Sequence, residues 1–234
     1  MAEINVADLI SKFQYAIDNK WGYIWGTAGD KWTQAKQNAA TRESTKEYGQ
    51  QWVGHYVADC SGMFHWAFKQ LGGYMYHGSN TMFRQYTTAN GKLSKGQRDD
   101  GQELKKGTAV FVYHQDEDKY SHVGLYIGNG QVIEASSTQV GVIKSQVTNK
   151  KWTHWGELKG VNYNGGDTPV PEGYAVVTGK RVALRTQPAT ELKIITRIDT
   201  GKTVKLEVPP PSEWEYVSYQ GKTGYMMKKF LKEG

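Results

Sequence analysis

Cys60 is the residue of this 234-residue chain best suited to act as a nucleophile, and it is the only cysteine. It lies in the segment Ala-Asp-Cys-Ser-Gly at 58–62, after which apolar residues recur at helical spacing as far as Leu71. At the first turn of a helix, unpaired N–H groups and the positive end of the helix dipole favour a thiolate. A buried structural cysteine fits the same pattern, because free cysteine is among the most buried residue types. The segment alone leaves both interpretations open.

A thiolate nucleophile needs a base, and the chain contains six histidines. Four are expected to be ordinary surface residues, one inside the helix that starts at Cys60 and three in polar surroundings: His65, His55, His77 and His154. His114 ends a predicted strand at a turn and is a minor candidate. His122 differs because it opens the alternating run 122–127, which predicts a strand and therefore the direction of its side chain.

The residues Gly-Asn-Gly at 128–130 predict a hairpin between two strands, 122–127 and 131–136. We expect a three-residue loop, a type I turn followed by Gly130 in the left-handed conformation. This register pairs Ile127 with Gln131, Leu125 with Ile133, Val123 with Ala135, Gly124 with Glu134 and His122 with Ser136. A two-residue loop would place Glu134 on the apolar face, burying an unpaired carboxylate at a cost of several kcal/mol.

The predicted register places Glu134 diagonally across from His122 on one face of the hairpin. Their Cβ atoms would be about 7 Å apart, which a glutamate side chain can span. Glu134 would fix the tautomer of the imidazole, leave its other nitrogen facing Cys60 and stabilise imidazolium beside thiolate. An exposed strand with ordinary polar residues remains the alternative.

The elements around these residues predict an α+β fold. Apolar spacing over 4–21 predicts an amphipathic helix, and a second helix begins at Cys60. The polar stretch 30–51 is interpreted as an insertion or long loop with a possible short helix, and 74–107 is expected to contain only short helical turns. Strands are predicted later in the chain, at 108–113, 122–127, 132–135, 140–147 and 157–163. Helices followed by an antiparallel sheet are typical of α+β domains.

A second domain is predicted at the C-terminal end. Residues 164–173 combine glycine and proline without periodicity and are interpreted as a linker. Residues 174–234 contain short strands separated by Gly and Pro, which predicts a small β-barrel. The predicted organisation is a domain at 1–163, the linker, and a domain at 174–234.

Composition narrows the classes of function. A single cysteine excludes an internal disulfide framework and a sulfur-rich zinc site, and neither a metal nor a cofactor is predicted. Residues 1–165 hold 18 Lys and Arg against 15 Asp and Glu, and residues 166–234 hold 11 against 8, so the net charge of +6 is spread evenly. A spread excess fits an anionic surface such as a bacterial wall better than nucleic acid. We expect a monomer.

The chain shows no segment for export or membrane insertion. Its first 20 residues lack the basic start and apolar run of a secretory signal. No apolar run approaches the roughly 20 residues that cross a bilayer. A soluble protein is expected, which reaches an extracellular target by another route, such as phage-type release, or from which a signal has been removed.

Four segments resemble the successive motifs of the NlpC/p60 family of papain-like peptidases, which cut bacterial peptidoglycan: residues 23–26, 59–62, 121–130 and 132–135. The resemblance covers residues 4 to about 163 and implies a papain-like fold. It implies that Cys60 is the nucleophile and that His122 is the general base and then the acid. Glu134 stands where the family most often has histidine. Because a carboxylate accepts a ring N–H, we expect orientation to be preserved, although the pH optimum can shift.

The resemblance also implies binding residues in both domains. Tyr23, Trp25, Asp59 and Ser61 correspond to the pocket for the acyl-side stem residues, L-Ala and D-Glu. Asp59 would suit a substrate amine, or it caps the helix. The C-terminal segment resembles bacterial SH3-type wall-binding domains. Four of its aromatic residues are candidates to bind the wall, with core packing as the alternative: Trp214, Tyr216, Tyr219 and Tyr225.

The implied reaction is hydrolysis, through a thioester, of the amide between the γ-carboxyl of D-Glu and a diamino acid, which the sequence does not identify as diaminopimelate or Lys. Action on the wall, in an extracellular or periplasmic location, is expected, and an endolysin fits the missing signal. Two alternatives remain. One is an N-acetylmuramoyl-L-alanine amidase. The other is a catalytically inactive wall-binding protein, whose Cys60 would be no more reactive than a free thiol.

Overall fold

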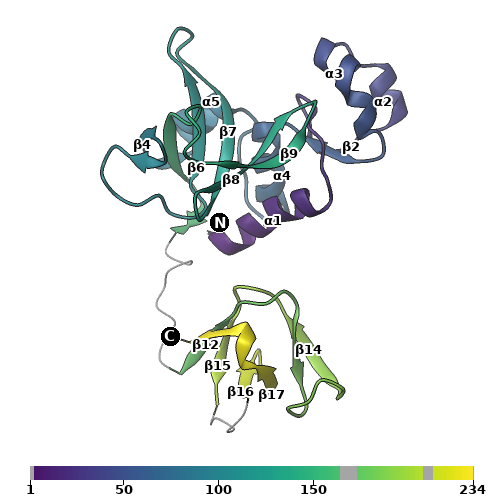
Figure 1. The fold of residues 1–234 in the computed structure, drawn as a ribbon, viewed down its shortest axis with the longest axis vertical. Helices are drawn as coiled ribbons and strands as arrows, with labels where there is room; N and C mark the ends of the chain where they lie inside the picture. The colour runs from purple at the N-terminus through teal and green to yellow at the C-terminus, as the bar shows by residue number, and fades with distance from the viewer. Residues whose placement is uncertain (1–2, 164–172, 208–212, 234) are drawn as a thin grey trace. The chain divides into compact units, whose positions relative to one another are not determined.

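The computed structural model describes residues 3–163, 173–207 and 213–233. The chain divides into two compact units, residues 1–166 and 167–234 (Figure 1). The predicted linker at 164–173 falls, except for Gly173, outside the described residues, so the predicted domain limits stay predictions. No helix in the described ranges is long and apolar enough to cross a membrane.

Of the helices in the described residues, all but one 3-10 helix lie in the first unit. They are α1 (Val6–Asp18), α2 (Gln34–Asn38), α3 (Glu43–Tyr48), the 3-10 helix η1 (Gly49–Trp52), α4 (Cys60–Gln70) and α5 (Ser79–Gln85). The side chain of Asn5 caps α1 by accepting the N–H of Ala7. Helix α1 is shorter than the predicted 4–21, because Lys20 already has a left-handed φ of 51°.

A seven-stranded antiparallel sheet forms the other half of this unit, with strand order β5-β4-β10-β6-β7-β8-β9. Its strands are β4 (Thr87–Ser94), β5 (Gln97–Arg98), β6 (Ala109–His114), β7 (Lys119–Gly128), β8 (Gln131–Ser137), β9 (Gly141–Gln146) and β10 (His154–Leu158). Two small sheets pair β1 (Ile4–Asn5) with β11 (Val161–Asn162), and β2 (Ala28–Lys31) with β3 (Tyr56–Ala58). Helices α1 and α4 pack on β7, which confirms the α+β class for this unit.

Two segments differ from the sequence-based expectation. Residues 74–107 contain α5 and the strands β4 and β5, where only short helical turns were expected. Strand β4 buries only Leu93 and is held by backbone pairing with β10, so it lacks the alternation that reveals a strand. The insertion at 30–51 forms two short helices that stand beyond β2 in Figure 1. Gln37 joins them, accepting from the Trp32 indole at 2.9 Å and donating to the Thr45 carbonyl at 3.0 Å.

The turn between β7 and β8 is also different. Asn129 and Gly130 have left-handed φ angles of 52° and 72°, and Gly128 rather than Ile127 pairs with Gln131. This is a two-residue hairpin loop of the kind that matches strand twist. The predicted three-residue loop is therefore wrong. A register shift between Tyr126 and Gly128 absorbs the difference.

Because of that shift, the residues before it keep the predicted pairing, and their side chains point to the predicted faces of the hairpin. Leu125 pairs with Ile133, as expected from the sequence. Both side chains are completely buried in the core that also contains Cys60. The bulge and the shorter loop thus compensate each other, and Glu134 keeps its place on the same face as His122.

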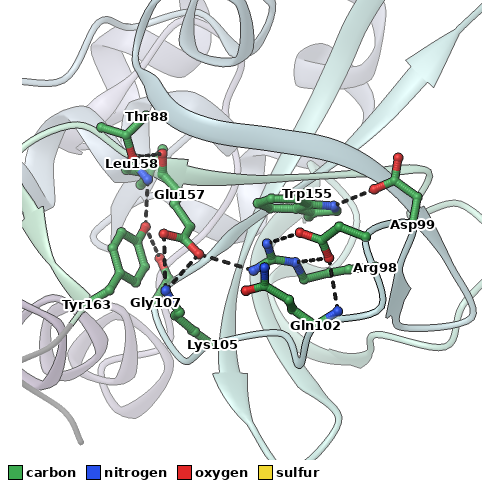
Figure 2. A network of polar contacts seen from close by, with 11 residues as sticks. Thr88, Arg98, Asp99, Gln102, Lys105, Gly107, Trp155, Glu157, Leu158 and Tyr163 are labelled. Carbon is green, nitrogen blue, oxygen red and sulfur yellow. Dashed lines mark hydrogen bonds and ion pairs between the residues drawn. The ribbon is translucent and has the colours of Figure 1, made fainter.

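A network of polar contacts joins the edge strand of this sheet to an inner strand (Figure 2). The Arg98 side chain, 3% exposed, lies with its guanidinium 3.5 Å from the centre of the Trp155 ring. It pairs with Asp100 and, at 3.1 Å, with Glu157, which also contacts Lys105 at 3.2 Å. The network therefore links β5 and the following loop to β10.

The second unit is all-β. Its seven strands form an antiparallel sheet in the order β14-β13-β17-β16-β15-β12-β18. They are β12 (Tyr174–Val177), β13 (Val182–Arg185), β14 (Ile194–Ile198), β15 (Thr203–Leu206), β16 (Trp214–Tyr219), β17 (Lys222–Met227) and β18 (Leu231–Glu233), with the 3-10 helix η3 (Lys228–Phe230) before the last. Aliphatic side chains such as Leu184 and Val217 make its core.

Candidate active site

Cys60 is the first residue of α4, as the sequence predicts. The preceding Asp59 caps the helix, because its Oδ1 accepts the N–H of Gly62 at 2.7 Å. A Cβ atom at Gly62 would lie 2.0 Å from the carbonyl oxygen of Thr27, so only glycine permits this approach. The helix start is therefore pressed against the segment that follows Trp25.

The carboxylate of Asp59 accepts four hydrogen bonds. Besides Gly62, its carboxylate accepts from the Ser61 hydroxyl at 3.1 Å, from the N–H of Gly26 at 2.8 Å and from His77 Nε2 at 2.9 Å. Burial alone would raise the pKa of Asp59, but the hydrogen bonds from His77 and the backbone bring it below the usual value. The N-cap role is thus the one that the structure shows, whereas binding of a substrate amine by Asp59 stays a prediction. His77, expected at the surface, holds this carboxylate.

The Cys60 thiol is 7% exposed, and its environment changes one expectation. Burial and then the Asp59 charge raise the pKa of Cys60 to about 12, although the N–H groups of Val123 and Ser61 act in the opposite direction. At neutral pH the resting residue is consequently a thiol. The N–H groups at the helix start favour a thiolate, as the sequence predicts, but in this environment desolvation and the Asp59 charge outweigh them.

His122 and Glu134 are in direct contact, which confirms the predicted pair. Nε2 of His122 lies 2.7 Å from Oε2 of Glu134, whose side chain is completely buried. Lys151, which the sequence analysis missed, places Nζ at 2.7 and 2.6 Å from the two carboxylate oxygens. Although burial would raise it, the hydrogen bonds from His122 and Lys151 lower the pKa of Glu134 to about 2. Glu134 is therefore ionised beside the imidazole.

Trp152 completes the surroundings of the imidazole. Its ring stacks on His122 with a centroid distance of 5.6 Å and an interplanar angle of 18°. The ammonium of Lys151 lies 4.6 Å from the same indole. Both residues belong to the turn before β10, where no periodicity marks them in the sequence. They fix the plane and the position of the ring.

The strand β7 brings the base to the nucleophile. The N–H of Val123, the residue after His122, contacts the Cys60 thiol, and α4 packs on β7. Because Glu134 occupies Nε2, Nδ1 is the ring nitrogen left to accept a proton. Within the described residues, no group of three or more His, Cys, Asp or Glu side chains is placed to hold a metal ion. The arrangement suits acyl transfer through sulfur.

Tyr23 lies near this centre, and Trp25 lines a neighbouring cavity together with Arg42. Burial, the Cys60 sulfur and the Asp59 carboxylate all raise the pKa of Tyr23, so its hydroxyl lies within electrostatic range of the nucleophile. Trp25 is 58% exposed, and the guanidinium of Arg42 lies 4.4 Å from its ring centre. Arg42 is the N-cap residue of α3, and its charge lowers the pKa of Tyr23, so the insertion that the sequence left without a role contributes a cation near Tyr23.

Comparison with known proteins identifies the first unit. The model of the NlpC/P60 family matches residues 23–158, more than half of the chain, including Cys60, His122 and Glu134. The chain belongs to the NlpC/P60 family. Its members are cysteine peptidases and peptidoglycan hydrolases.

Solved structures of other NlpC/P60 proteins are similar to this chain at low identity. The NlpC/p60 domain of the peptidoglycan hydrolase SagA is 20% identical, with a TM-score of 0.42, and the match covers 66% of this chain and all of that one. The peptidoglycan hydrolase RipB from Mycobacterium tuberculosis is 23% identical (TM-score 0.38; 64% and 66% covered). NlpC2 from Trichomonas vaginalis is 18% identical (TM-score 0.43; 64% and 46% covered), so this chain spans under half of its length. No curated protein matches the chain.

The aromatic residues predicted to bind the wall lie in the second unit, outside the NlpC/P60 match. Tyr216 and Tyr225 are cross-strand partners whose ring centres are 4.9 Å apart. Trp214 shares their half-buried face, whereas Tyr219 packs against the aliphatic core. Trp214, Tyr216 and Tyr225 are thus not core residues, and their role in binding the wall stays a prediction.

Proposed function

We propose that this NlpC/P60 protein is a cysteine endopeptidase that hydrolyses the amide between D-γ-glutamate and a diamino acid in peptidoglycan stem peptides. The observation that supports it most is the 2.7 Å contact between His122 and an ionised, buried Glu134, one residue from the backbone N–H that touches the Cys60 thiol. Hydrolysis of peptidoglycan is the activity of the family. The bond and the residue roles are the proposal.

Acylation begins with the neutral thiol. As Cys60 Sγ attacks the carbonyl carbon, its proton passes to Nδ1 of His122, and Glu134 stabilises the imidazolium that forms. Backbone N–H groups at the start of α4 stabilise the tetrahedral oxyanion. When the C–N bond breaks, His122 returns the proton to the leaving amine, and a thioester remains on Cys60.

Deacylation reverses these roles. His122 removes a proton from a water molecule as its oxygen attacks the thioester carbon. The C–S bond then breaks, and the sulfur regains the proton from His122. One amide and one water become one acid and one amine, with no cofactor consumed.

Residues around the centre are proposed to bind the stem peptide. Tyr23, Trp25 and Ser61 would contact the L-Ala and D-Glu residues, and Asp59 would serve the substrate amine in addition to capping α4. We further propose that the second unit is an SH3-type domain that retains the enzyme on the wall, in an endolysin-like arrangement. These assignments are supported by the position of Tyr23 near Cys60 and by the half-buried aromatic face on β16 and β17.

The test is digestion of defined diaminopimelate-type and Lys-type muropeptides, with the products identified by mass. We expect new amino termini on the diamino acid, and none with Cys60→Ala, whose fold is checked by circular dichroism and thermal unfolding. Full activity of Cys60→Ala would contradict the proposal. Cleavage of lactyl-peptide linkages instead would assign an amidase.

Turnover, rather than alkylation, separates an active enzyme from an inactive wall-binding protein. Because the pKa of Cys60 is raised to about 12, slow reaction with iodoacetamide at low pH is expected of both. Product formation lost with Cys60→Ala is expected only of the enzyme.

A further inference from the structure

A cavity in the second unit is lined by positive charge. It has a volume of about 240 Å³, and Lys180, Arg181, Arg185 and Arg197 line it together with Trp214. No acidic residue contributes to the lining. The cations come from β13, β14 and the turn before β13, so the fold gathers them from separate segments.

These four cations have no carboxylate partner within the described residues. Arg185 donates to the carbonyl of Leu192 at 2.6 Å, and Arg197 donates to the carbonyl of Arg181 at 3.2 Å. Each guanidinium carries five N–H donors, so most remain for a ligand while these bonds hold the heads in place.

Neighbouring carboxylates are engaged elsewhere. Glu191 accepts a hydrogen bond from the Thr190 hydroxyl at 3.0 Å, and Glu215 is buried and pairs with Lys228 at 2.8 Å. Like charges held around one cavity repel each other, and an anion relieves this repulsion. In the part of the chain that the structure describes, no carboxylate forms an ion pair with the cations that line the cavity.

We propose that this cavity binds phosphate groups of an anionic cell-wall polymer. Guanidinium forks match phosphate oxygens in pairs, and several converging cations suit a repeating phosphate chain better than one isolated carboxylate. The proposal does not depend on which peptide bond the first unit cuts.

The test uses the full chain carrying Cys60→Ala and, as probe, poly(glycerol phosphate), with poly-glutamate and single-stranded DNA as comparison polyanions. We expect the tightest binding to poly(glycerol phosphate), weakening as salt rises. The double variant Arg181→Gln/Arg197→Gln should bind at least about tenfold more weakly, because it removes two charge-assisted contacts. The matched control Lys193→Gln/Lys222→Gln removes the same charge from exposed positions outside the cavity and should bind as before.

Walls provide the second measurement. Sedimentation of the protein with bacterial walls should fall after hydrofluoric acid removes their phosphate polymers. Arg181→Lys/Arg197→Lys, which keeps the charge, should bind between the parent and the Gln variant, and thermal unfolding shows whether each variant is folded. Equal weakening by both double Gln variants, equal or tighter binding of either comparison polyanion, or unchanged sedimentation with stripped walls would overturn the proposal.

Discussion

Two buried polar networks on the same sheet are built from the same kinds of side chain and differ in what they can do. In the first, shown in Figure 2, Arg98 stacks on Trp155 and pairs with Glu157, which Lys105 also contacts. In the second, a histidine stacks on a tryptophan and pairs with a glutamate that a lysine also contacts, near Cys60. One tryptophan, one glutamate and one lysine therefore recur around a different central residue.

The central residue decides the consequence. Arg98 is always charged and offers only donors, so its network is a permanent link between strands. His122 can gain and lose a proton, and Glu134 occupies only one of its two nitrogens. The comparison teaches that a stacked ion-pair network becomes a proton-transfer site when its central cation is titratable and a nucleophile is adjacent.

The largest expected effect breaks the catalytic network. His122→Gln removes the base and should lower kcat on muropeptides by about 10²–10⁴-fold, the usual contribution of a general acid–base. Arg98→Gln should leave kcat within about threefold of the parent, because no reacting group touches it. Product formation followed by mass checks both, and a similar loss in the two variants would show that the networks are not distinct.

Stability should show the opposite order. Arg98→Met removes from Asp100 and Glu157 a cation whose side chain is 3% exposed, and leaves Glu157 only the contact with Lys105, which is 42% exposed, so the free energy of unfolding should fall clearly. His122→Gln should cost less, because Lys151 still neutralises Glu134. Urea unfolding at pH 7 measures both, and a larger loss in His122→Gln would contradict the comparison.

The dependence of stability on acid pH should show how much Lys151 contributes through Glu134. The folded pKa of Glu134 is about 2, below its ordinary value of 4.5, so its stabilisation is complete above about pH 4.5 and is lost as pH falls toward 2. Lys151→Met should raise that folded pKa, which makes the protein less stable above pH 4.5 and flattens the slope below it. Urea unfolding between pH 2 and 6 tests this, with Lys105→Met as control. An unchanged slope in Lys151→Met would show that Lys151 does not act through Glu134.

The smallest effect concerns a third pair, His77 with Asp59. The hydrogen bond that His77 donates to Asp59 raises the pKa of His77, so the stability that it contributes is complete below about pH 6.5 and is lost as pH rises through the folded pKa. Because His77 is partly exposed, we expect a change of a few tenths to about 1 kcal/mol. The difference in unfolding free energy between the parent and His77→Gln should shrink from pH 6 to pH 9. A constant difference would mean that the pair is not ionic.

Local patterns in the sequence were sufficient to predict where the central residues of the candidate site lie on their helix and strands. Helical spacing after Cys60 predicted the start of α4, and alternation in two strands predicted that His122 and Glu134 share a face. The loop was predicted wrongly, yet the bulge next to Gly128 restored the phase, because burying Leu125 requires it. Period-two burial is a stronger constraint than the turn type.

Other features depend on contacts between distant segments. Lys151 and Trp152 lie in a turn with no period, and strand β4 depends on backbone pairing with β10. Neither type of contact leaves a repeating pattern of apolar residues. Such elements could not be predicted from one chain by spacing alone.

By itself, the sequence determined which side chains could be nucleophile, base and orienting carboxylate, because these depend on residue type and on the repeat of a helix or strand. Only the tertiary structure decided the ionisation of Cys60 and Glu134. Packing α4 against β7 buries the Cys60 thiol and raises its pKa, while Lys151 and His122 keep the buried Glu134 charged. Desolvation and partner charges act through space, from residues far apart in the chain, and so they are set by the fold.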